Sequence, residues 1–256
     1  MGFLTVEGVS HRFPGVHGGP PTEALSRTDL SVEDNDFIAI LGPSGCGKST
    51  LLRIVAGLET PTTGRVLLDG QPVTGPGPDR GMVFQSYTLF PWLTVEQNIL
   101  FGSRAKPARA AELIARVGLR GFERHYPKML SGGMQQRTAL ARALANDPKI
   151  LLMDEPFGAL DNQTRALMQE LLLGIWEADR KTVLFVTHDI DEAIFMANRV
   201  VVLSARPGRI KADVRIELPH PRHYTMKTSS VFSVYKAQLT EEIRTEAMKT
   251  VEMGHA

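Results

Sequence analysis

The sequence is poor in several features that define whole classes of proteins. Cys46 is the one cysteine in the chain, so no internal disulfide is available and we expect a protein of a reducing compartment. No window reaches the roughly 18 uncharged apolar residues that a membrane span requires. The first residues also lack the basic segment and the apolar run of a secretory signal. We therefore expect a soluble, intracellular protein.

An excess of charge of one sign is absent as well. The 29 Lys and Arg residues are matched by 28 Asp and Glu residues, which leaves a net charge of +1. This balance excludes a protein held on nucleic acid or anionic lipid by bulk charge, so such a partner would have to be recognised locally. With 256 residues, of which 43% are apolar, the chain can form one or two compact units, and disorder of the whole chain is excluded.

Apolar runs and helical patterns alternate along the chain. Strands are predicted at residues 4–9, 37–41, 150–153, 183–186 and 200–203, and the last four are typical of strands buried on both faces. Helices are predicted at residues 49–56, 95–101, 108–117, 133–145, 163–178 and 190–197. This alternation predicts an α/β fold with a mainly parallel sheet. Residues 86–147 hold several helices and no convincing strand, which predicts a helical subdomain inserted between two strands.

The strongest local motif lies between a predicted strand and a predicted helix, at residues 42–49. Its sequence, Gly-Pro-Ser-Gly-Cys-Gly-Lys-Ser, matches the phosphate-binding loop G-x-x-x-x-G-K-S/T. In such a loop the glycines let backbone N–H groups face one concavity, and the helix N-terminus adds its positive dipole end. Lys48 can then reach the β- and γ-phosphates, and the Ser49 hydroxyl can bind Mg²⁺. The alternative is a glycine-rich turn without a ligand.

Two acids, Asp154 and Glu155, end the apolar run at residues 150–153. At the carboxyl edge of a parallel sheet we expect them beside the phosphate-binding loop. Asp154 would hold Mg²⁺ through water, and Glu155 would orient or deprotonate the attacking water. The alternative is a strand that ends in two solvated acids.

A turn of Ser131, Gly132 and Gly133 opens another predicted helix. The N-terminus of this helix is a second candidate phosphate site in the chain. A plain N-cap by Ser131 is the alternative.

The order of these motifs resembles the ATP-binding cassette (ABC) family, in particular the nucleotide-binding subunit of an importer. The resemblance covers roughly residues 4–211. It includes Gln85 after a strand, the Leu-Ser-Gly-Gly signature at residues 130–133, the Ala-Leu-Asp turn ending at Asp161, and His188 after a strand. It implies a P-loop NTPase (RecA-like) core, an N-terminal antiparallel β subdomain and the inserted helical subdomain. It also implies an ATPase domain at residues 1–215 and a partly helical C-terminal extension at residues 216–256.

The resemblance implies roles for individual residues and implies ATP and Mg²⁺ as cofactors. The implied catalytic residues are Lys48, Gln85, Glu155 and His188, and a structural histidine is the alternative for His188. The implied Mg²⁺ ligands are Ser49, Gln85 and Asp154. The implied ATP contacts are Phe13, which would stack on adenine, and Gly42, Pro43, Ser44, Gly45, Cys46, Gly47, Lys48, Ser49, Thr50, Ser131, Gly132, Gly133, Gln135 and Asp161. In the family the signature turn contacts the γ-phosphate of the opposite subunit, which implies a head-to-tail dimer with an identical or paralogous ATP-binding subunit.

A narrower resemblance, at residues 75–85, 89–92, 171–176 and 188–193, is to importers of taurine, sulfonates and nitrate or bicarbonate. It implies an ATPase that energises uptake of such an anion and that lies peripherally at the cytoplasmic face of the cell membrane. The implied partners are transmembrane permease subunits and, indirectly, a periplasmic or extracellular solute-binding protein, with no nucleic acid.

Two other classes of P-loop protein are alternatives. A non-transport ABC ATPase acting on nucleic acid or the ribosome usually has long coiled coils or two cassettes, whereas here 82 residues separate Lys48 from Ser131 in one cassette. A P-loop kinase or GTPase would leave the signature turn unexplained, and the guanine-reading motif Asn-Lys-x-Asp does not occur.

Two further segments each allow two interpretations. Residues 89–92, Leu-Phe-Pro-Trp, form either a surface for a short helix of the membrane subunit or the small core of the helical subdomain. In the tail, apolar residues recur every four positions from Val231 to Ala247. This pattern predicts an amphipathic helix that packs on the domain or offers a regulatory surface.

Overall fold

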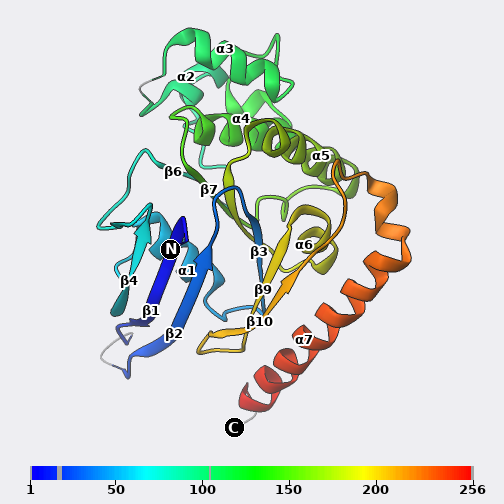
Figure 1. Ribbon diagram of the computed structural model, residues 1–256. Coiled ribbons are helices and arrows are strands. Elements are labelled where there is room, and N and C mark those ends of the chain that lie inside the picture. Colours follow the sequence, from blue (N-terminus) through cyan, green and yellow to red (C-terminus); the bar gives the residue numbers. More distant parts are fainter. Residues whose placement is uncertain (1, 16–18, 104, 255–256) are drawn as a thin grey trace. The chain divides into compact units, whose positions relative to one another are not determined.

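The protein forms two compact units in a computed structural model that describes residues 2–15, 19–103 and 105–254 (Figure 1). The first unit is built from Met1–Gly77 together with Thr182–Ala256, and the second from Pro78–Lys181.

The first unit contains an antiparallel sheet in the order β2-β1-β4-β5. Its strands are β1 (Leu4–Phe13), β2 (Thr22–Val32), β4 (Thr63–Leu68) and β5 (Gln71–Pro72). Strand β1 pairs antiparallel with β2 on one side and with β4 on the other. Alternate residues of β1 such as Leu4 and Val6 are buried, as in a strand with one face on a core. The implied N-terminal antiparallel β subdomain is therefore confirmed.

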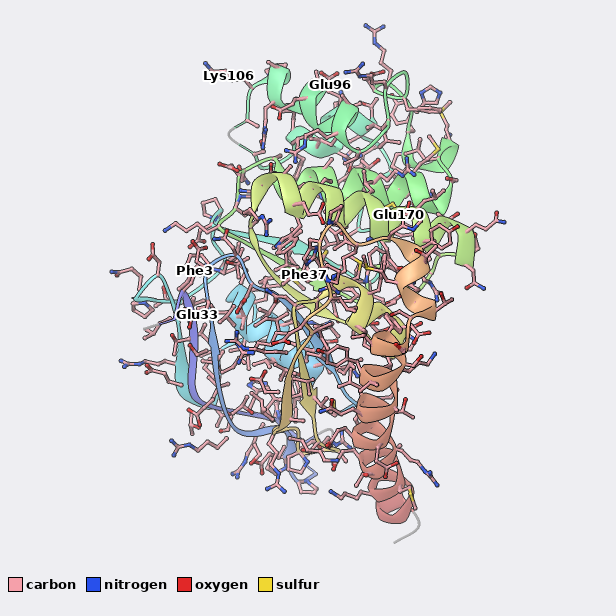
Figure 2. All side chains as sticks on the ribbon, turned by 45° about the vertical axis from the view of Figure 1, so that its right-hand side comes forward. Phe3, Glu33, Phe37, Glu96, Lys106 and Glu170 are labelled. Carbon is pink, nitrogen blue, oxygen red and sulfur yellow. The ribbon has the colours of Figure 1, made fainter. Side chains whose placement is uncertain are left out.

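A second sheet of the same unit is mainly parallel. Strand β3 (Phe37–Leu41) pairs in parallel with β8 (Thr182–Val186) and β9 (Arg199–Leu203), and β10 (Ile210–Arg215) adds antiparallel to β9. Every residue of β3 and β8 is buried, which explains their continuous apolar sequences. Figure 2 shows Phe37 among other side chains, and Phe37 is fully buried whereas Glu33 is exposed. The helices of this unit are α1 (Lys48–Ala56), α6 (Ile190–Met196), the short η3 (Tyr224–Thr228) and α7 (Ser230–Gly254).

The second unit holds a parallel pair of strands, β6 (Arg80–Val83) and β7 (Ile150–Asp154), in which Val83 is opposite Met153. Its helices are α2 (Val95–Leu100), α3 (Pro107–Arg116), η2 (Pro127–Met129), α4 (Gly132–Leu144) and α5 (Asn162–Asp179). The described residues between β6 and β7 contain helices and no strand, as predicted. Separate domains bounded at residues 86–147 and at residue 216 stay a prediction.

The predicted fold class is confirmed, but the apolar pattern missed five of the strands in the described part of the chain. These are β2, β4, β5, β6 and β10, and their burial explains the omission. In β10, for example, half-buried and exposed residues alternate and none is fully buried, so no apolar run marks the strand. Pattern-based prediction finds strands that are covered on both faces more easily than strands at a sheet edge.

The predicted C-terminal helix exists as α7, and it packs on α6 and β9 of its own unit. The predicted stripe of residues every four positions is wrong in detail, because Val231 is 49% exposed and Ala247 is exposed. Leu239 of the predicted stripe is buried, and the other buried side chains in the described part of α7 are Phe232 and Glu246, each seven positions from Leu239. A helix has 3.6 residues per turn, so a seven-residue spacing stays on one face while a four-residue spacing drifts around it.

Within the described residues, no helix combines the length and the apolar character needed to cross a membrane.

Candidate functional site

The phosphate-binding loop (residues 42–49) connects β3 to α1, the arrangement that the motif requires. Gly45 and Gly47 have φ angles of 74° and 99°, which residues with a side chain rarely adopt, so the two glycines shape the loop. Gly47 is also the N-cap of α1, and the first turn of that helix contains no acidic residue. The N-terminal N–H groups of α1 and its positive dipole end are therefore not neutralised by an adjacent carboxylate on the helix.

Lys48 is held inside this loop. Its side chain is only 6% exposed, and its Nζ donates to the carbonyl oxygens of Gly42 at 2.8 Å and Pro43 at 3.0 Å. These two bonds occupy two of the three N–H donors of the ammonium group. The loop thus keeps a cation in place beside exposed Ser44 and Gly45, which fits a site for an anionic phosphate.

The other residues of the loop differ in how deeply they are buried. Ser49 and Thr50 are half-buried at the start of α1, as is Pro43 in the loop itself. Cys46 is 1% exposed, and burial raises the pKa of its thiol although the charge of Lys48 opposes this. A hydroxyl at Ser49 beside a phosphate cradle is an oxygen donor of the kind that Mg²⁺ prefers.

His188 leaves the same edge of the sheet as the phosphate-binding loop. Strands β3 and β8 are parallel with Ile40 opposite Val186, and the N–H of Thr187 donates to the carbonyl of Ile40 at 3.2 Å. The next turn is fixed by Asp189, whose carboxylate accepts from the N–H groups of Asp191 and Glu192 at 2.8 and 3.1 Å. His188 is exposed on this rigid turn. The role of His188, a ligand contact or a structural histidine, stays a prediction.

Phe13, predicted to stack on adenine, is the last residue of β1 and is half-buried. Its ring lies 4.5 Å from that of His11 in an edge-to-face arrangement. Part of the loop that follows, residues 16–18, lies outside the described residues.

In the second unit Gln85 and Glu155 meet beyond the carboxyl ends of β6 and β7. The Nε2 of Gln85 donates to Oε2 of Glu155 at 3.4 Å. Glu155 has a φ angle of 44°, which is unusual for a residue with a side chain, and such strain gathers at functional sites. Asp154, one residue earlier, is 6% exposed at the end of β7. The predicted strand with two terminal acids is thus present, and Gln85 is brought to the second of them.

The signature turn (residues 130–133) opens helix α4. The Ser131 hydroxyl caps the helix by accepting from the N–H of Met134 at 3.3 Å, and the first turn contains no acidic residue. Ser131 and Gly132 are exposed, whereas Gly133 is buried and a Cβ there would lie 2.5 Å from the Cγ2 of Thr164. Ser131 is therefore an N-cap, as the alternative interpretation held, and it also leaves an exposed helix N-terminus of the kind that binds anions.

Gln135 and Asp161 are engaged with the backbone of their own unit. The Nε2 of Gln135 donates to the carbonyls of Pro127 and Leu130, each at 3.2 Å, and so holds the segment before the signature turn. Asp161 caps helix α5, accepting from the N–H of Thr164 at 3.0 Å and from its hydroxyl at 2.7 Å. These bonds lower the pKa of Asp161, with the Thr164 N–H as the largest cause. Both residues shape the backbone near candidate ligand-binding turns.

The side chains of Phe90, Trp92 and Phe101 form an aromatic patch on the second unit. The ring of Phe90 lies 5.5 Å from that of Trp92 and 4.2 Å from that of Phe101. Trp92 is 68% exposed and Phe101 54% exposed. Because exposed aromatic clusters mark partner sites, and because these side chains are not buried, the structure favours the partner surface over the interpretation of a small core.

Sequence reasoning missed several buried polar residues, among them Asn98, Arg222 and Glu246. Asn98 is fully buried under the aromatic patch and donates to the carbonyls of Phe90, Leu93 and Thr94. Arg222 is 7% exposed and donates to the carbonyls of Ile194 and Ala197 near the end of α6. Glu246 of α7 is 1% exposed. Asn98 directly precedes a buried apolar residue, and the other two stand among exposed positions, so no local pattern identified any of them.

The chain belongs to the ABC transporter family, whose sequence profile matches residues 25–158. It is an ABC-type ATPase, as the motif order predicted. It is 52% identical over 255 residues to an uncharacterized ABC transporter ATP-binding protein of Methanocaldococcus jannaschii, and the match covers 97% of this chain and 94% of the relative. It is 45% identical to the aliphatic sulfonates import ATP-binding protein SsuB of Bacillus cereus, covering 98% and 96% of the two chains. The narrower resemblance to the sulfonate importers is thus confirmed as a resemblance.

Solved structures of two cassettes are similar to this chain. A dimeric ATP-binding cassette in a post-hydrolysis state, bound to ADP and Pi, has a TM-score of 0.74 at 34% identity over 84% of this chain and 100% of that chain. The protein cbiO1 from Clostridium perfringens, part of the ABC transporter complex cbiONQ, has a TM-score of 0.72 at 27% identity over 84% of this chain and 89% of that chain.

Proposed function

We propose that this ATPase is the nucleotide-binding subunit of an importer that takes up a small anion, with aliphatic sulfonates favoured over taurine, nitrate and bicarbonate. The main support for the ATP site is the position of Lys48. Its side chain is bonded to two loop carbonyls at the sheet edge from which His188 also emerges. The sulfonate preference is supported by the relatives named as sulfonate import proteins. The proposed location is the cytoplasmic face of the cell membrane, where the chain is bound peripherally.

Binding of ATP is assigned to the first unit. Lys48 neutralises the β- and γ-phosphates, the backbone N–H groups of residues 44–50 surround them, and Phe13 stacks on the adenine. His188 donates to the γ-phosphate. Ser49, Gln85 and Asp154 are the residues that would hold Mg²⁺, which would supply positive charge to stabilise the phosphates.

Hydrolysis is assigned to residues of the second unit. Glu155 accepts a proton from the attacking water, and Gln85, which donates to Glu155, holds the carboxylate and orients that water. Phosphoryl transfer needs positioning and charge stabilisation more than covalent chemistry from the protein, which these two side chains and Lys48 can provide.

Coupling to transport is assigned to the signature turn and to the aromatic patch. Ser131, Gly132 and Gly133 bind the γ-phosphate held by a second ATP-binding subunit, so that ATP closes a head-to-tail dimer. Phe90, Trp92 and Phe101 receive an apolar segment of the permease, which passes the closure to the membrane subunits; a solute-binding protein acts only indirectly. ATP can drive this closure because it binds the closed dimer more tightly than the open one.

Uptake measurements test the proposal. Cells that lack this chain are complemented with wild type or with Lys48→Ala, and uptake of a labelled aliphatic sulfonate, taurine, nitrate and bicarbonate is compared. Sulfonate uptake that depends on Lys48 is the expected result. Uptake of a different anion would overturn the choice of solute. Normal uptake of all four without the chain, together with its co-purification with ribosomes or nucleic acid, would overturn the transport role.

A further inference from the structure

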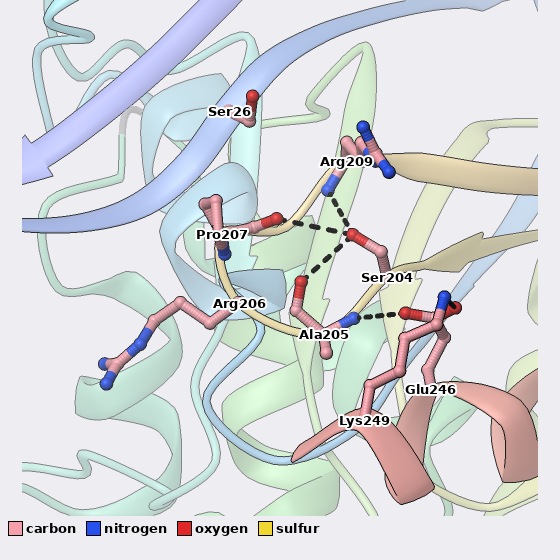
Figure 3. Close-up of a pocket in the computed structure, with 8 residues that line it drawn as sticks. All are labelled: Ser26, Ser204, Ala205, Arg206, Pro207, Arg209, Glu246 and Lys249. Carbon is pink, nitrogen blue, oxygen red and sulfur yellow. Dashed lines mark hydrogen bonds and ion pairs between the residues drawn. The ribbon is translucent and has the colours of Figure 1, made fainter. Parts of the chain in front are cut away.

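The turn between β9 and β10 (residues 204–209, here called the hairpin turn) is bonded to the C-terminal helix α7. The N–H of Ala205 donates to Oε2 of Glu246 at 2.8 Å, as Figure 3 shows. Ala205 is 7% exposed and Glu246 is 1% exposed, so this bond is shielded from water. A buried backbone N–H that lost this acceptor would carry the full cost of an unsatisfied donor.

Glu246 is an unusual residue for its place on α7. It continues the buried face marked by Phe232 and Leu239, where an apolar side chain would be expected. Its Oε1 instead pairs with Lys249 at 2.7 Å and Lys211 at 3.2 Å. Apolar packing is often as stabilising as a buried ion pair, so stability alone does not explain a carboxylate here. What an apolar residue could not provide is the acceptor for Ala205.

The hairpin turn is stiffened by its own hydrogen bonds. The hydroxyl of Ser204 donates to the carbonyls of Ala205 at 3.0 Å and Pro207 at 3.3 Å, and it accepts from the N–H of Arg209 at 3.1 Å. The hydrogen-bonded atoms of Ser204, Ala205, Pro207 and Arg209 therefore move together. We therefore expect a displacement at Ala205 to reach Gly208.

The other side of the hairpin turn contacts the phosphate-binding loop. The N–H of Gly208 donates to the carbonyl of Ala24 at 3.0 Å, and the N–H of Ser26 donates to the carbonyl of Gly208 at 2.9 Å. A Cβ atom on Gly208 would lie 1.9 Å from the carbonyl oxygen of Cys46, so the two backbones are in direct contact there. Only glycine allows this approach.

Strand β2 also contacts the phosphate-binding loop, at Gly47, the residue after Cys46. A Cβ atom on Gly47 would lie 2.7 Å from the carbonyl oxygen of Ala24 and 2.7 Å from a methyl carbon of Leu25. Gly47 is the N-cap of α1, and it directly precedes Lys48. The hairpin turn thus supports two successive residues of the phosphate-binding loop, one directly and one through β2.

Packing alone restrains the hairpin turn poorly on the side of α7. A pocket of about 270 Å³ lies there, lined by Ser26, by residues 204–207 and 209, and by Glu246 and Lys249 (Figure 3). This space is not filled by side chains, and the bond from Ala205 to Glu246 connects the turn to the helix across its edge.

We propose that Glu246 is a positioning residue for nucleotide binding, which holds the phosphate-binding loop in its binding-competent shape through the hairpin turn. This inference rests on the proposed role of residues 42–49 in binding ATP. It makes α7 a part of the nucleotide site rather than an appendage that only packs on the unit.

The test compares variants of Glu246 with a matched control on the same helix. Glu242 lies one turn earlier and also pairs with Lys211, at 3.0 Å; among the described residues its carboxylate has no bond to the hairpin turn. Glu246→Ala, Glu246→Asp, Glu246→Gln and Glu242→Ala are made in the full chain. For each, the Kd for ATP, the melting temperature and the rate of Cys46 alkylation without nucleotide are measured. Cys46 is the one cysteine of the chain and reports the state of the loop directly.

Glu246→Ala is expected to weaken ATP binding about tenfold and to speed Cys46 alkylation about tenfold, the effect of losing one hydrogen bond to a charged group. Glu246→Gln keeps an acceptor for Ala205, so both values should return toward wild type even though the lysine pairs are lost. Glu246→Asp keeps the charge but is one methylene short of Ala205, and it should resemble Glu246→Ala. Glu242→Ala should leave both values unchanged.

A lower melting temperature with unchanged ATP affinity and unchanged alkylation in Glu246→Ala would show a merely structural role and overturn the inference. If Glu246→Ala does not fold, the same three measurements on Glu246→Asp decide between the two roles. A wild-type protein whose Cys46 is not protected by ATP would instead refute the proposed role of the loop itself, so the two failures can be told apart.

Discussion

The side-chain amide of Gln85 donates to the carboxylate of Glu155 at 3.4 Å, and so connects the ends of two parallel strands. The two residues are 70 positions apart in the chain. A neutral donor beside the carboxylate orients it without neutralising its charge, which suits the role of proton acceptor that we propose for Glu155.

Replacement of Glu155 by Gln should abolish hydrolysis and retain ATP binding. The amide keeps the size of the side chain but cannot accept the proton, and general bases contribute about 10²–10⁴-fold to a rate. We expect steady-state ATPase activity to fall by about that factor while the Kd for ATP changes less than threefold. The control is Glu170→Gln, an exposed acid of helix α5. Equal activities of the two variants would refute the role of Glu155.

Alkylation of Cys46 should be slow, and ATP should slow it further. Burial raises the pKa of the thiol, so little thiolate is present at neutral pH, and a nucleotide in the loop would cover it. The rate of labelling by a small thiol reagent, followed by mass spectrometry with and without ATP·Mg²⁺, checks this. Labelling that ATP does not slow would count against a formed phosphate site at residues 42–49.

Loss of Trp92 should uncouple the chain from its membrane partner without affecting the fold. The side chain is 68% exposed, so Trp92→Ser should change the melting temperature by no more than about 2 °C. We expect co-purification with the permease to be lost and the ATPase activity of the isolated chain to persist. Leu167→Ser, at a residue 56% exposed on α5, is the control and should keep the partner. Retained co-purification of the Trp92 variant would rule out the aromatic patch as the docking surface.

Because of Glu246, the free energy of unfolding should also fall at acidic pH. Burial opposes its charge, but the bonds from Lys249, Ala205 and Lys211 outweigh burial and lower its pKa from 4.5 to about 2. A lowered pKa stabilises the folded state above pH 4.5, and this stabilisation, roughly 3 kcal/mol, is lost as the pH falls from 4.5 toward 2. Urea unfolding at pH 7, 5, 4 and 3 should show wild type losing its advantage over Glu246→Gln in that window. A constant difference between the two proteins would contradict this assignment.

The sequence alone supported the parts of the fold and site that are encoded locally. The buried strands β3 and β8 have continuous apolar sequences, and the loop before Lys48 is marked by three glycines within six residues. Asp154 and Glu155, at the end of β7, are likewise marked locally, by the apolar run that precedes them. Each of these depends on neighbours in the chain, so a pattern of a few residues is enough to identify it.

The parts that were missed depend on distant contacts. Glu246 looks like an ordinary helix-surface acid until Ala205, 41 residues away, is seen to donate to it. Strand β10 is recognised only through its pairing with β9, because its own residues are half-exposed. Gly208 looks like a simple turn residue, and its reason for being glycine lies in Cys46, far away in the sequence. Tertiary contacts decide such positions, and no local pattern records them.

We propose that ATP joins two copies of this ABC subunit through the signature turn, and the oligomeric state of Glu155→Gln decides whether it does. Light scattering with and without ATP·Mg²⁺ should show a monomer that becomes a dimer when ATP is added. Adding Ser131→Arg should abolish the dimer, because Ser131 is exposed and a large side chain would block the proposed contact, whereas Ser233→Arg on α7 should not. A Glu155→Gln protein that binds ATP and stays monomeric, or a dimer that tolerates Ser131→Arg, would contradict the claim.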